Sequence, residues 1–426
     1  MGDCPVDIRT FLDHYDHLST QFADAPFEVW DEMRDQCPMA RSDRYGGFWI
    51  PTRYEDIGRI AHDTEVFSSR RVAIPANLFG QEGEDTMEFS APPITSDPPF
   101  HTKFRRMLLP AFSPKQVAEW EPATWRIANE LIDGFIDEPR IDAARAYAQN
   151  VPITVIARML GVDESHRDVF TTWLRRLVET GPQDPDGAKE AFTEMLGYLS
   201  AKIAEHREHP QPDIITFLID TEVDGDRLSD FDLLGTCLLL LLAGIDTTWS
   251  SIGSSIHHLA THADDRARLV AALDDPESDL WTLAIEEFLR AFSPVTMARY
   301  VASEVEIQGQ TLEPGDMLLL PFPAANRDPR AFPQADEVII DRRDNRHYAF
   351  GVGVHRCLGS NLARMELRVA LQAFLRRIPD FSIPDGERVR YAGGQIRGPR
   401  ELPLDLAPRR STPEPVNSRA HAGRAG

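Results

Sequence analysis

The chain has 426 residues and a formal net charge of −23 at pH 7, with 42% hydrophobic and 27% charged residues. This composition is typical of a globular protein with ample material for a core, and no Gly-, Ser- or Pro-rich linker divides residues 20–405. The excess of negative charge disfavours nucleic acid and anionic membranes as partners.

The four cysteines, at positions 4, 37, 237 and 357, form no CxxC pair and no regular framework. The N-terminus is acidic and lacks the apolar core of a signal peptide. The longest apolar run, from Cys237 to Ala243, is too short to span a bilayer. We therefore expect a soluble, cytoplasmic protein whose cysteines are reduced thiols, apart from any that bind a metal.

Helical periodicity dominates between a loose lead-in at residues 1–19 and a tail at residues 407–426 that we expect to be disordered. Helices are predicted at residues 27–36, 54–61, 101–106, 116–136, 152–161, 163–180, 188–209, 229–262, 284–290 and 362–374. Short strands are predicted at residues 48–50, 52–54, 301–306, 310–312 and 317–321. Residues 68–96 show little periodicity and predict a long loop. The fold class is therefore mainly α with small β-sheets, as one domain over residues 20–406.

The helix that opens at His101 carries Arg105 four residues later, so the two side chains share one face. Such a face can bind an anion. A solvated basic face is the alternative interpretation, and this fragment alone favours it.

A longer helix is predicted from an N-cap at Ser229, and it is almost entirely apolar in its first half. Asp246, Thr247 and Thr248 lie near its centre, where polar groups are costly to bury. Because Gly244 lacks a side chain and threonine hydroxyls bond back to the helix, this stretch predicts a local gap in the helix wall. A kink with an exposed polar face is the alternative.

Glu287 and Arg290 are three residues apart on a later helix and can form an ion pair. Pro294 ends that helix, and the chain becomes extended through Val295, Thr296 and Met297.

Cys357 lies in a glycine-rich turn directly before the helix at residues 362–374. Backbone N–H groups of such a turn, a helix N-terminus and the adjacent Arg356 all stabilise a thiolate. A buried structural cysteine is the alternative, because no further cysteine or histidine lies at zinc-site spacing.

The string Phe350-Gly-x-Gly-x-His-x-Cys357-x-Gly359 resembles the haem-ligating loop of the cytochrome P450 family, and Ala243-Gly-x-Asp246-Thr247-Thr resembles its oxygen-activation motif. The resemblance covers residues 20–406 and implies the cytochrome P450 fold, a single haem domain with a long central helix that crosses the haem. It implies haem b as cofactor, with Cys357 as the iron ligand.

The same resemblance assigns further residues. His101, Arg105, Arg299 and His355 are expected to bind the haem propionates, and Ala243, Phe350 and Gly359 to contact the haem. Asp246 and Thr247 are the expected catalytic pair: Thr247 donates a hydrogen bond to bound oxygen, and Asp246 relays protons. Val295, Thr296, Met297 and Ile396 are candidates for the substrate pocket. Arg70, Arg71 and Arg397 reach a substrate carboxylate only if they point inward.

Glu287 and Arg290 match the structural Glu-x-x-Arg pair of the family. Many relatives place an arginine where this chain has Glu337, so the third member of that network is not evident from the sequence.

The resemblance implies a monooxygenase that uses O₂, most simply to hydroxylate a small organic substrate. No reductase motif is present, so electrons are expected from NAD(P)H through a reductase and a separate ferredoxin or flavodoxin. Basic residues that could attract an acidic partner are Lys103, Arg105, Arg106, Lys115, Arg356, Arg364 and Arg368. Oxidative coupling, a peroxide-driven enzyme and a non-catalytic haem protein are the alternatives.

Overall fold

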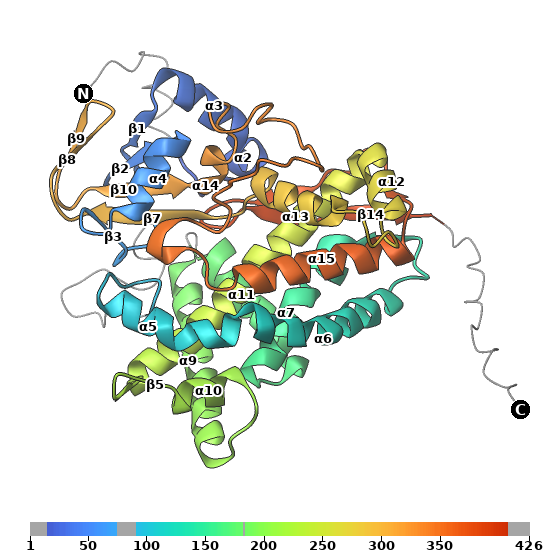
Figure 1. Ribbon diagram of the computed structural model, residues 1–426, viewed down its shortest axis with the longest axis horizontal. Helices are drawn as coiled ribbons and strands as arrows, with labels where there is room; N and C mark the ends of the chain where they lie inside the picture. Colours follow the sequence, from blue (N-terminus) through green and yellow to red (C-terminus); the bar gives the residue numbers. More distant parts are fainter. Residues whose placement is uncertain (1–14, 75–90, 182–183, 408–426) are drawn as a thin grey trace, which may run out of the picture.

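The computed structural model describes residues 15–74, 91–181 and 184–407 (Figure 1). A large helical block makes up most of the protein, and a smaller part built on a five-stranded sheet lies at one end of it (Figure 1). The predicted fold class, mainly α with small sheets, is confirmed. The predicted tail and most of the loop at residues 68–96 lie outside the described residues.

Most predicted helices are present, with boundaries that shift by a few residues. The helices are α2 (Thr20–Asp24), α3 (Pro26–Gln36), α4 (Tyr54–His62), α5 (Phe100–Leu108), α6 (Pro114–Asp133), α7 (Asn150–Leu160), α8 (Arg167–Leu174), α9 (Pro185–Glu208), α10 (Ile214–Asp220), α11 (Asp230–Thr261), α12 (Ala263–Ala271), α13 (Leu280–Ala291), α14 (Phe322–Ala325) and α15 (Ser360–Arg377). Shorter 3-10 or π-helical turns are η1 (Arg44–Gly46), η3 (Leu109–Phe112), η4 (Ala144–Ala148), η5 (Glu164–His166), η6 (Arg175–Glu179) and η7 (Gly353–His355).

The main sheet has the strand order β1-β2-β10-β7-β3, in which β2 and β10 are parallel and the other pairs antiparallel. Its strands are β1 (Met39–Ser42), β2 (Phe48–Pro51), β3 (Phe67–Ser68), β7 (Thr296–Val301) and β10 (Met317–Pro321). A three-stranded sheet, β11-β14-β4, contains β4 (Arg140–Asp142), β11 (Phe381–Ser382) and β14 (Pro403–Leu406). Three hairpins pair β5 (Glu222–Val223) with β6 (Asp226–Arg227), β8 (Val305–Ile307) with β9 (Gln310–Leu312), and β12 (Arg390–Ala392) with β13 (Gly398–Glu401).

The strand predicted at residues 52–54 is wrong, because α4 already begins at Tyr54. The N–H of Tyr54 donates to the carboxylate of Asp328 at 2.9 Å. A residue 274 positions away therefore satisfies an N-terminal N–H of this helix, which no local pattern reveals.

Helix α11 runs through the middle of the protein and contacts α7, α9, α15 and β13 (Figure 1). The hydroxyl of Ser229 caps it by accepting a hydrogen bond from the N–H of Asp232 at 3.1 Å, as predicted. In the described part of the chain, α11 alone is long and apolar enough to cross a membrane. Its apolar face is buried against other helices, however, as in the core helix of a soluble protein.

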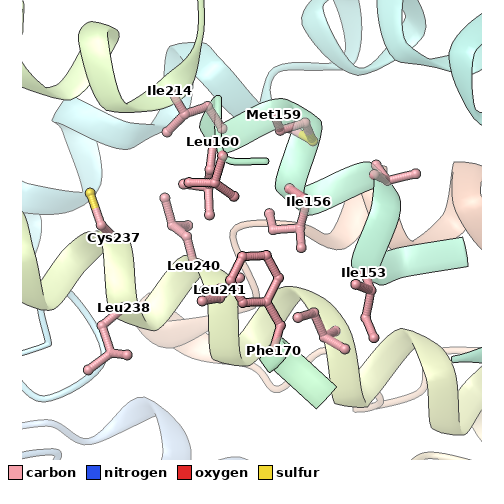
Figure 2. Packing of buried hydrophobic residues seen from close by; sticks show 14 of the residues in the cluster. Ile153, Ile156, Met159, Leu160, Phe170, Ile214, Cys237, Leu238, Leu240 and Leu241 are labelled. Atoms are coloured by element: carbon pink, nitrogen blue, oxygen red, sulfur yellow. The ribbon is translucent and has the colours of Figure 1, made fainter. Parts of the chain in front are cut away.

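The largest contact of α11 within the core is with α7 (Figure 2). Ile153, Ile156 and Leu160 of α7 point toward α11, and Leu240 of α11 points toward Leu160. Full burial of each such side chain contributes about 1.5–3 kcal/mol. This packing fixes the centre of α11 relative to its neighbours.

The expectation of reduced thiols is wrong at Cys37, which is disulfide-bonded. Cys237 is a free, buried thiol in the core, and burial raises its pKa to about 12. Cys357 is also free.

Candidate active site

The loop that holds Cys357 is folded tightly against α4. Gly351 and Gly353 have φ angles of +64° and +75°, a region that favours glycine. A Cβ atom on Gly353 would lie 2.6 Å from the carbonyl oxygen of Ala61, so this backbone approach excludes a side chain. The N–H of Cys357 donates to the carbonyl of Phe350 at 2.7 Å and closes the loop.

The sulfur of Cys357 lies among groups that stabilise negative charge. Its side chain is exposed, yet the surrounding protein desolvates the sulfur enough to raise the pKa of the thiol. The N–H of Gly359 and the guanidinium groups of Arg105, Arg356 and Arg364 oppose that shift. Binding to a metal cation would remove the remaining cost of ionisation, so the donor set suits a metal-bound thiolate.

Beside this loop, the structure brings together His101 and Arg105 of α5, Arg299 of β7 and His355 of η7. The rings of His101 and His355 have centroids 4.2 Å apart. Both ring nitrogens of His101 and Nε2 of His355 are buried without a hydrogen-bond partner among the described residues. Burial and the positive charges of Arg299, His101 and Arg105 lower the pKa of His355 to about 2.

Arg299 is 4% exposed, and its Nη1 donates to the carbonyl of Ala298 at 2.7 Å. Burial lowers the pKa of Arg299 to about 10. The nearby carboxylate of Asp97 already accepts hydrogen bonds from the Ser68 hydroxyl and the Ser69 N–H. Buried donors without partners are costly, and two further carboxylates would satisfy them. This cluster therefore fits the propionate groups of a haem.

On α11, Ala243 is exposed and Thr247 is half-buried, so this part of an otherwise buried helix faces open space. The Thr247 hydroxyl donates back to the carbonyl of Ala243 at 2.9 Å, as predicted. The predicted gap is wrong for Gly244, because α11 is continuous here. A Cβ atom on Gly244 would lie 3.0 Å from Cγ1 of Ile156, so this glycine permits close packing with α7 instead.

Asp246 points to a residue that the sequence did not single out. Its Oδ1 lies 2.7 Å from Nη2 of Arg400 on β13, and the two side chains are 5% and 7% exposed. One signal is present in the sequence, since Arg400 lies four residues after the pocket candidate Ile396, on the β12–β13 hairpin. Spacing alone does not show that this hairpin reaches α11.

The Glu287–Arg290 pair is fully buried, with two contacts of 2.8 Å. The missing third member of the network is Arg342, whose Nε lies 3.0 Å from Oε2 of Glu287. Glu337 contributes only its backbone carbonyl, which accepts from Arg290 at 2.7 Å. The expected arginine therefore lies five residues after Glu337, because the loop between these two residues carries the Arg342 side chain to Glu287.

Val295 and Ile396, both pocket candidates, form an isolated antiparallel bridge. Thr296 is buried at the start of β7, while Val295, Met297 and Ile396 are half-buried. The structure thus brings the turn of the β12–β13 hairpin next to the start of β7.

The three loop arginines differ in their surroundings. Arg70 is 72% exposed on its side chain and lies 3.9 Å from Asp97, and Arg71 is also exposed. Nε of Arg397 donates to the carbonyl of Ala23 at 2.6 Å, and its guanidinium lies 4.2 Å from the ring of Tyr391. The Arg397 side chain therefore contacts other residues of the protein, Ala23 and Tyr391.

Most of the predicted basic residues around Cys357 are paired with acidic ones. Lys103 and Arg106 contact Asp226 and Asp224 of the β5–β6 hairpin, the latter pair at 3.2 Å. Arg364 pairs with Glu286 at 2.6 Å, and Arg368 pairs with Glu121 at 2.7 Å. This surface is consequently less positive than its sequence predicted.

A family model described as Cytochrome P450 matches residues 183–388. The chain is 33% identical over 406 residues to vitamin D(3) 25-hydroxylase from Pseudonocardia autotrophica, with 94% of this chain and 98% of that protein covered. It is 32% identical over 384 residues to mycinamicin IV hydroxylase/epoxidase from Micromonospora griseorubida, with coverage of 88% and 94%.

Two solved structures resemble the whole described fold. The cytochrome P450 PksS of the Bacillus subtilis 168 bacillaene polyketide synthase has a TM-score of 0.83 at 29% identity, and covers 92% of this chain and 100% of that one. CYP109E1 from Bacillus megaterium in complex with testosterone has a TM-score of 0.82 at 29% identity, with coverage of 91% and 99%.

Proposed function

This chain belongs to the cytochrome P450 family and is a haem-thiolate monooxygenase, and we propose that it hydroxylates a bulky, mainly apolar natural product. The observation that carries this proposal is a set of apolar side chains that are not fully buried: Ala243 on α11, and Val295, Met297 and Ile396 at the β12–β13 hairpin. Apolar linings with few polar groups suit ligands of that kind. The names of the relatives, which refer to vitamin D(3), mycinamicin IV and a polyketide, support the same substrate class.

Within this site, Cys357 is proposed to ligate the haem iron. His101, Arg105, Arg299 and His355 would bind the propionates, which would satisfy the buried ring nitrogens of His101 and His355. When bound, haem supplies an iron that binds O₂ and cleaves it with electrons from a partner protein.

Thr247 and Asp246 are proposed to serve proton delivery. The Thr247 hydroxyl lies on the open side of α11 and can turn from the carbonyl of Ala243 to donate a hydrogen bond into the pocket. Asp246, one residue earlier, is buried on the side of α11 that faces β13 and can accept a proton and pass it on.

Electrons are proposed to arrive from a separate ferredoxin or flavodoxin reduced by an NAD(P)H-dependent reductase. Arg356 is the exposed residue next to Cys357, and it provides positive charge for an acidic donor.

Two absorbance measurements test the proposal. The reduced protein with carbon monoxide should show the strongly red-shifted band of thiolate-bound haem, and a band typical of histidine ligation would reject Cys357 as the ligand. The oxidised protein is then titrated with vitamin D3, testosterone and a macrolide. We expect at least one to cause a low-to-high spin shift at micromolar concentration. If none does so, while a small polar compound does, the substrate class is wrong.

A further inference from the structure

The buried ion pair between Asp246 and Arg400 assigns a role to a strand outside the known motifs. We propose that Arg400 is a positioning residue that keeps the Asp246 carboxylate ionised and directed toward β13. This inference rests on the proposed role of Asp246 in proton delivery. An ionised carboxylate can accept a proton and pass it on in every turnover, whereas a carboxyl group that stays protonated cannot accept one.

The burial of the pair supports a specific effect of Arg400 on Asp246. The two side chains are 5% and 7% exposed, and Nη2 of Arg400 lies 2.7 Å from Oδ1 of Asp246. A carboxylate this deeply buried favours its neutral form unless an opposite charge stands close to it. The Arg400 guanidinium provides that charge at contact distance.

Arg400 is itself held in place by contacts with α11. Its Nη1 donates to the hydroxyl of Ser250 at 3.2 Å, and its guanidinium lies 4.3 Å from the ring centroid of Trp249. The guanidinium of Arg175 in η6 lies 5.7 Å from the centroid of the same ring. The Arg400 guanidinium is therefore held against α11, and Arg175 contacts the same Trp249 ring.

The strand cannot shift easily relative to the helix. A Cβ atom on Gly398 would lie 2.2 Å from the Ser250 hydroxyl oxygen, and one on Gly253 would lie 3.0 Å from Cγ of Pro399. Both glycines allow β13 to lie directly on α11. Because backbone packing sets this distance, Arg400 meets Asp246 in one defined geometry.

A purely structural ion pair is the competing explanation. It predicts that loss of Arg400 lowers stability and haem content, while the protein that does carry haem remains fully coupled. The positioning role instead predicts that a larger share of the electrons from NAD(P)H forms hydrogen peroxide and a smaller share forms product. The test therefore compares product and hydrogen peroxide formed per NAD(P)H in haem-loaded protein.

Arg400→Gln is expected to raise the peroxide share at least threefold, and Arg400→Lys, which keeps the charge, to recover at least half of the coupling. Arg390→Gln is the matched control: Arg390 lies on the neighbouring strand β12 in an exposed ion pair with Glu401 at 2.8 Å. Arg390→Gln should form product and peroxide per NAD(P)H in the same proportion as the parent. Coupling of Arg400→Gln equal to the parent, or no recovery with Arg400→Lys, overturns the proposal.

A second readout does not depend on activity. The infrared difference spectrum of each protein minus its Asp246→Asn counterpart isolates the Asp246 carboxyl group. We expect an ionised carboxylate in the parent and a protonated acid in Arg400→Gln at the same neutral pH. An ionised carboxylate in both overturns the proposal.

Two further variants keep the outcomes separate. If Arg400→Gln does not load haem, Ser250→Ala removes one contact of the guanidinium, and its peroxide share should lie between those of the parent and Asp246→Asn. Parent-like coupling in Ser250→Ala then counts against Arg400. If Asp246→Asn itself couples like the parent, the proposed role of Asp246 fails, whatever Arg400 does.

Discussion

At Thr247, a single hydroxyl group has two possible uses. It donates to the carbonyl of Ala243 at 2.9 Å in the structure, and the proposed function requires it to donate into the pocket during turnover. The back-bond is a local alternative that costs little to break, because the helix hydrogen bonds remain.

Thr247→Ala should therefore change the fate of electrons more than the fold. We expect NAD(P)H to be consumed within threefold of the parent rate, while the peroxide share rises at least threefold. Stability should change by less than about 1 kcal/mol. Ser251→Ala is the control, since the Ser251 hydroxyl makes the same kind of back-bond, to Thr247, at 2.9 Å. Equal coupling in both variants would reject the role of Thr247.

Arg342 and Arg343 are adjacent residues with opposite surroundings. Arg342 is 7% exposed on its side chain and pairs with the fully buried Glu287, whereas Arg343 is 76% exposed and pairs with Asp279 at 3.0 Å. Loss of one partner of a buried charge is expensive, and loss of an exposed pair is not.

Arg342→Ala is expected to lower the free energy of unfolding by about 2–4 kcal/mol, since Arg290 still compensates part of the Glu287 charge. Arg343→Ala should change it by about 0.5 kcal/mol or less. Urea unfolding followed by circular dichroism measures both. Similar losses in the two variants would mean that Glu287 does not depend on Arg342.

At the scale of elements, two helix-interior glycines separate helix propensity from packing. Gly197 of α9 has nothing within 4 Å of an added Cβ atom, whereas Gly244 of α11 would place one 3.0 Å from Ile156. Alanine is the better helix former by about 1 kcal/mol at both positions.

Gly197→Ala should consequently raise stability by about 0.5–1 kcal/mol. Gly244→Ala should not, because overpacking against α7 costs about 1–3 kcal/mol and outweighs the gain. Thermal or urea unfolding of the two variants decides the matter. A stabilised Gly244→Ala protein would show that α7 can move away from α11.

At the scale of the whole molecule, the net charge of −23 repels an acidic electron donor except at a locally positive surface. The β5–β6 hairpin reduces the positive charge of the surface around Cys357. Asp224 and Gly225 at its tip have positive φ angles, and Asp224 and Asp226 pair with Arg106 and Lys103 of α5. The hairpin thus occupies basic groups that an acidic donor would otherwise contact.

The double variant Asp224→Asn/Asp226→Asn should speed reduction by an acidic ferredoxin at least threefold at low ionic strength. The gain in reduction rate should vanish at high salt, because charges are screened beyond about 3 Å at 1 M ionic strength. Stopped-flow reduction under carbon monoxide measures the rate.

Asp274→Asn/Asp405→Asn makes the same charge change on exposed pairs elsewhere, with Arg376 and Arg140. If it accelerates reduction equally, net charge rather than the hairpin controls docking. If neither variant changes the rate, the donor does not use this face of α5.

Much of this protein was predictable from local pattern. Helix periodicity, the Ser229 cap and the i,i+3 pair of Glu287 with Arg290 depend on neighbours within one or two turns, and the structure contains all three. The glycines before Cys357 announce a turn that only glycine adopts readily, and their φ angles are positive. Resemblance of short motifs then supplied the family.

The remaining features depend on residues that meet only after folding. Arg400 reaches Asp246 from 154 positions away because β13 packs on α11, and Arg342 replaces the expected arginine because a loop carries it to Glu287. The helix predicted from Tyr54 is capped by Asp328, which lies 274 positions away. Sequence alone determined most of the helices, the cysteine loop and the family, since these follow from short-range geometry. Only the tertiary structure decided which charges are paired, because burial and distance set the energy of an ion and neither is encoded locally.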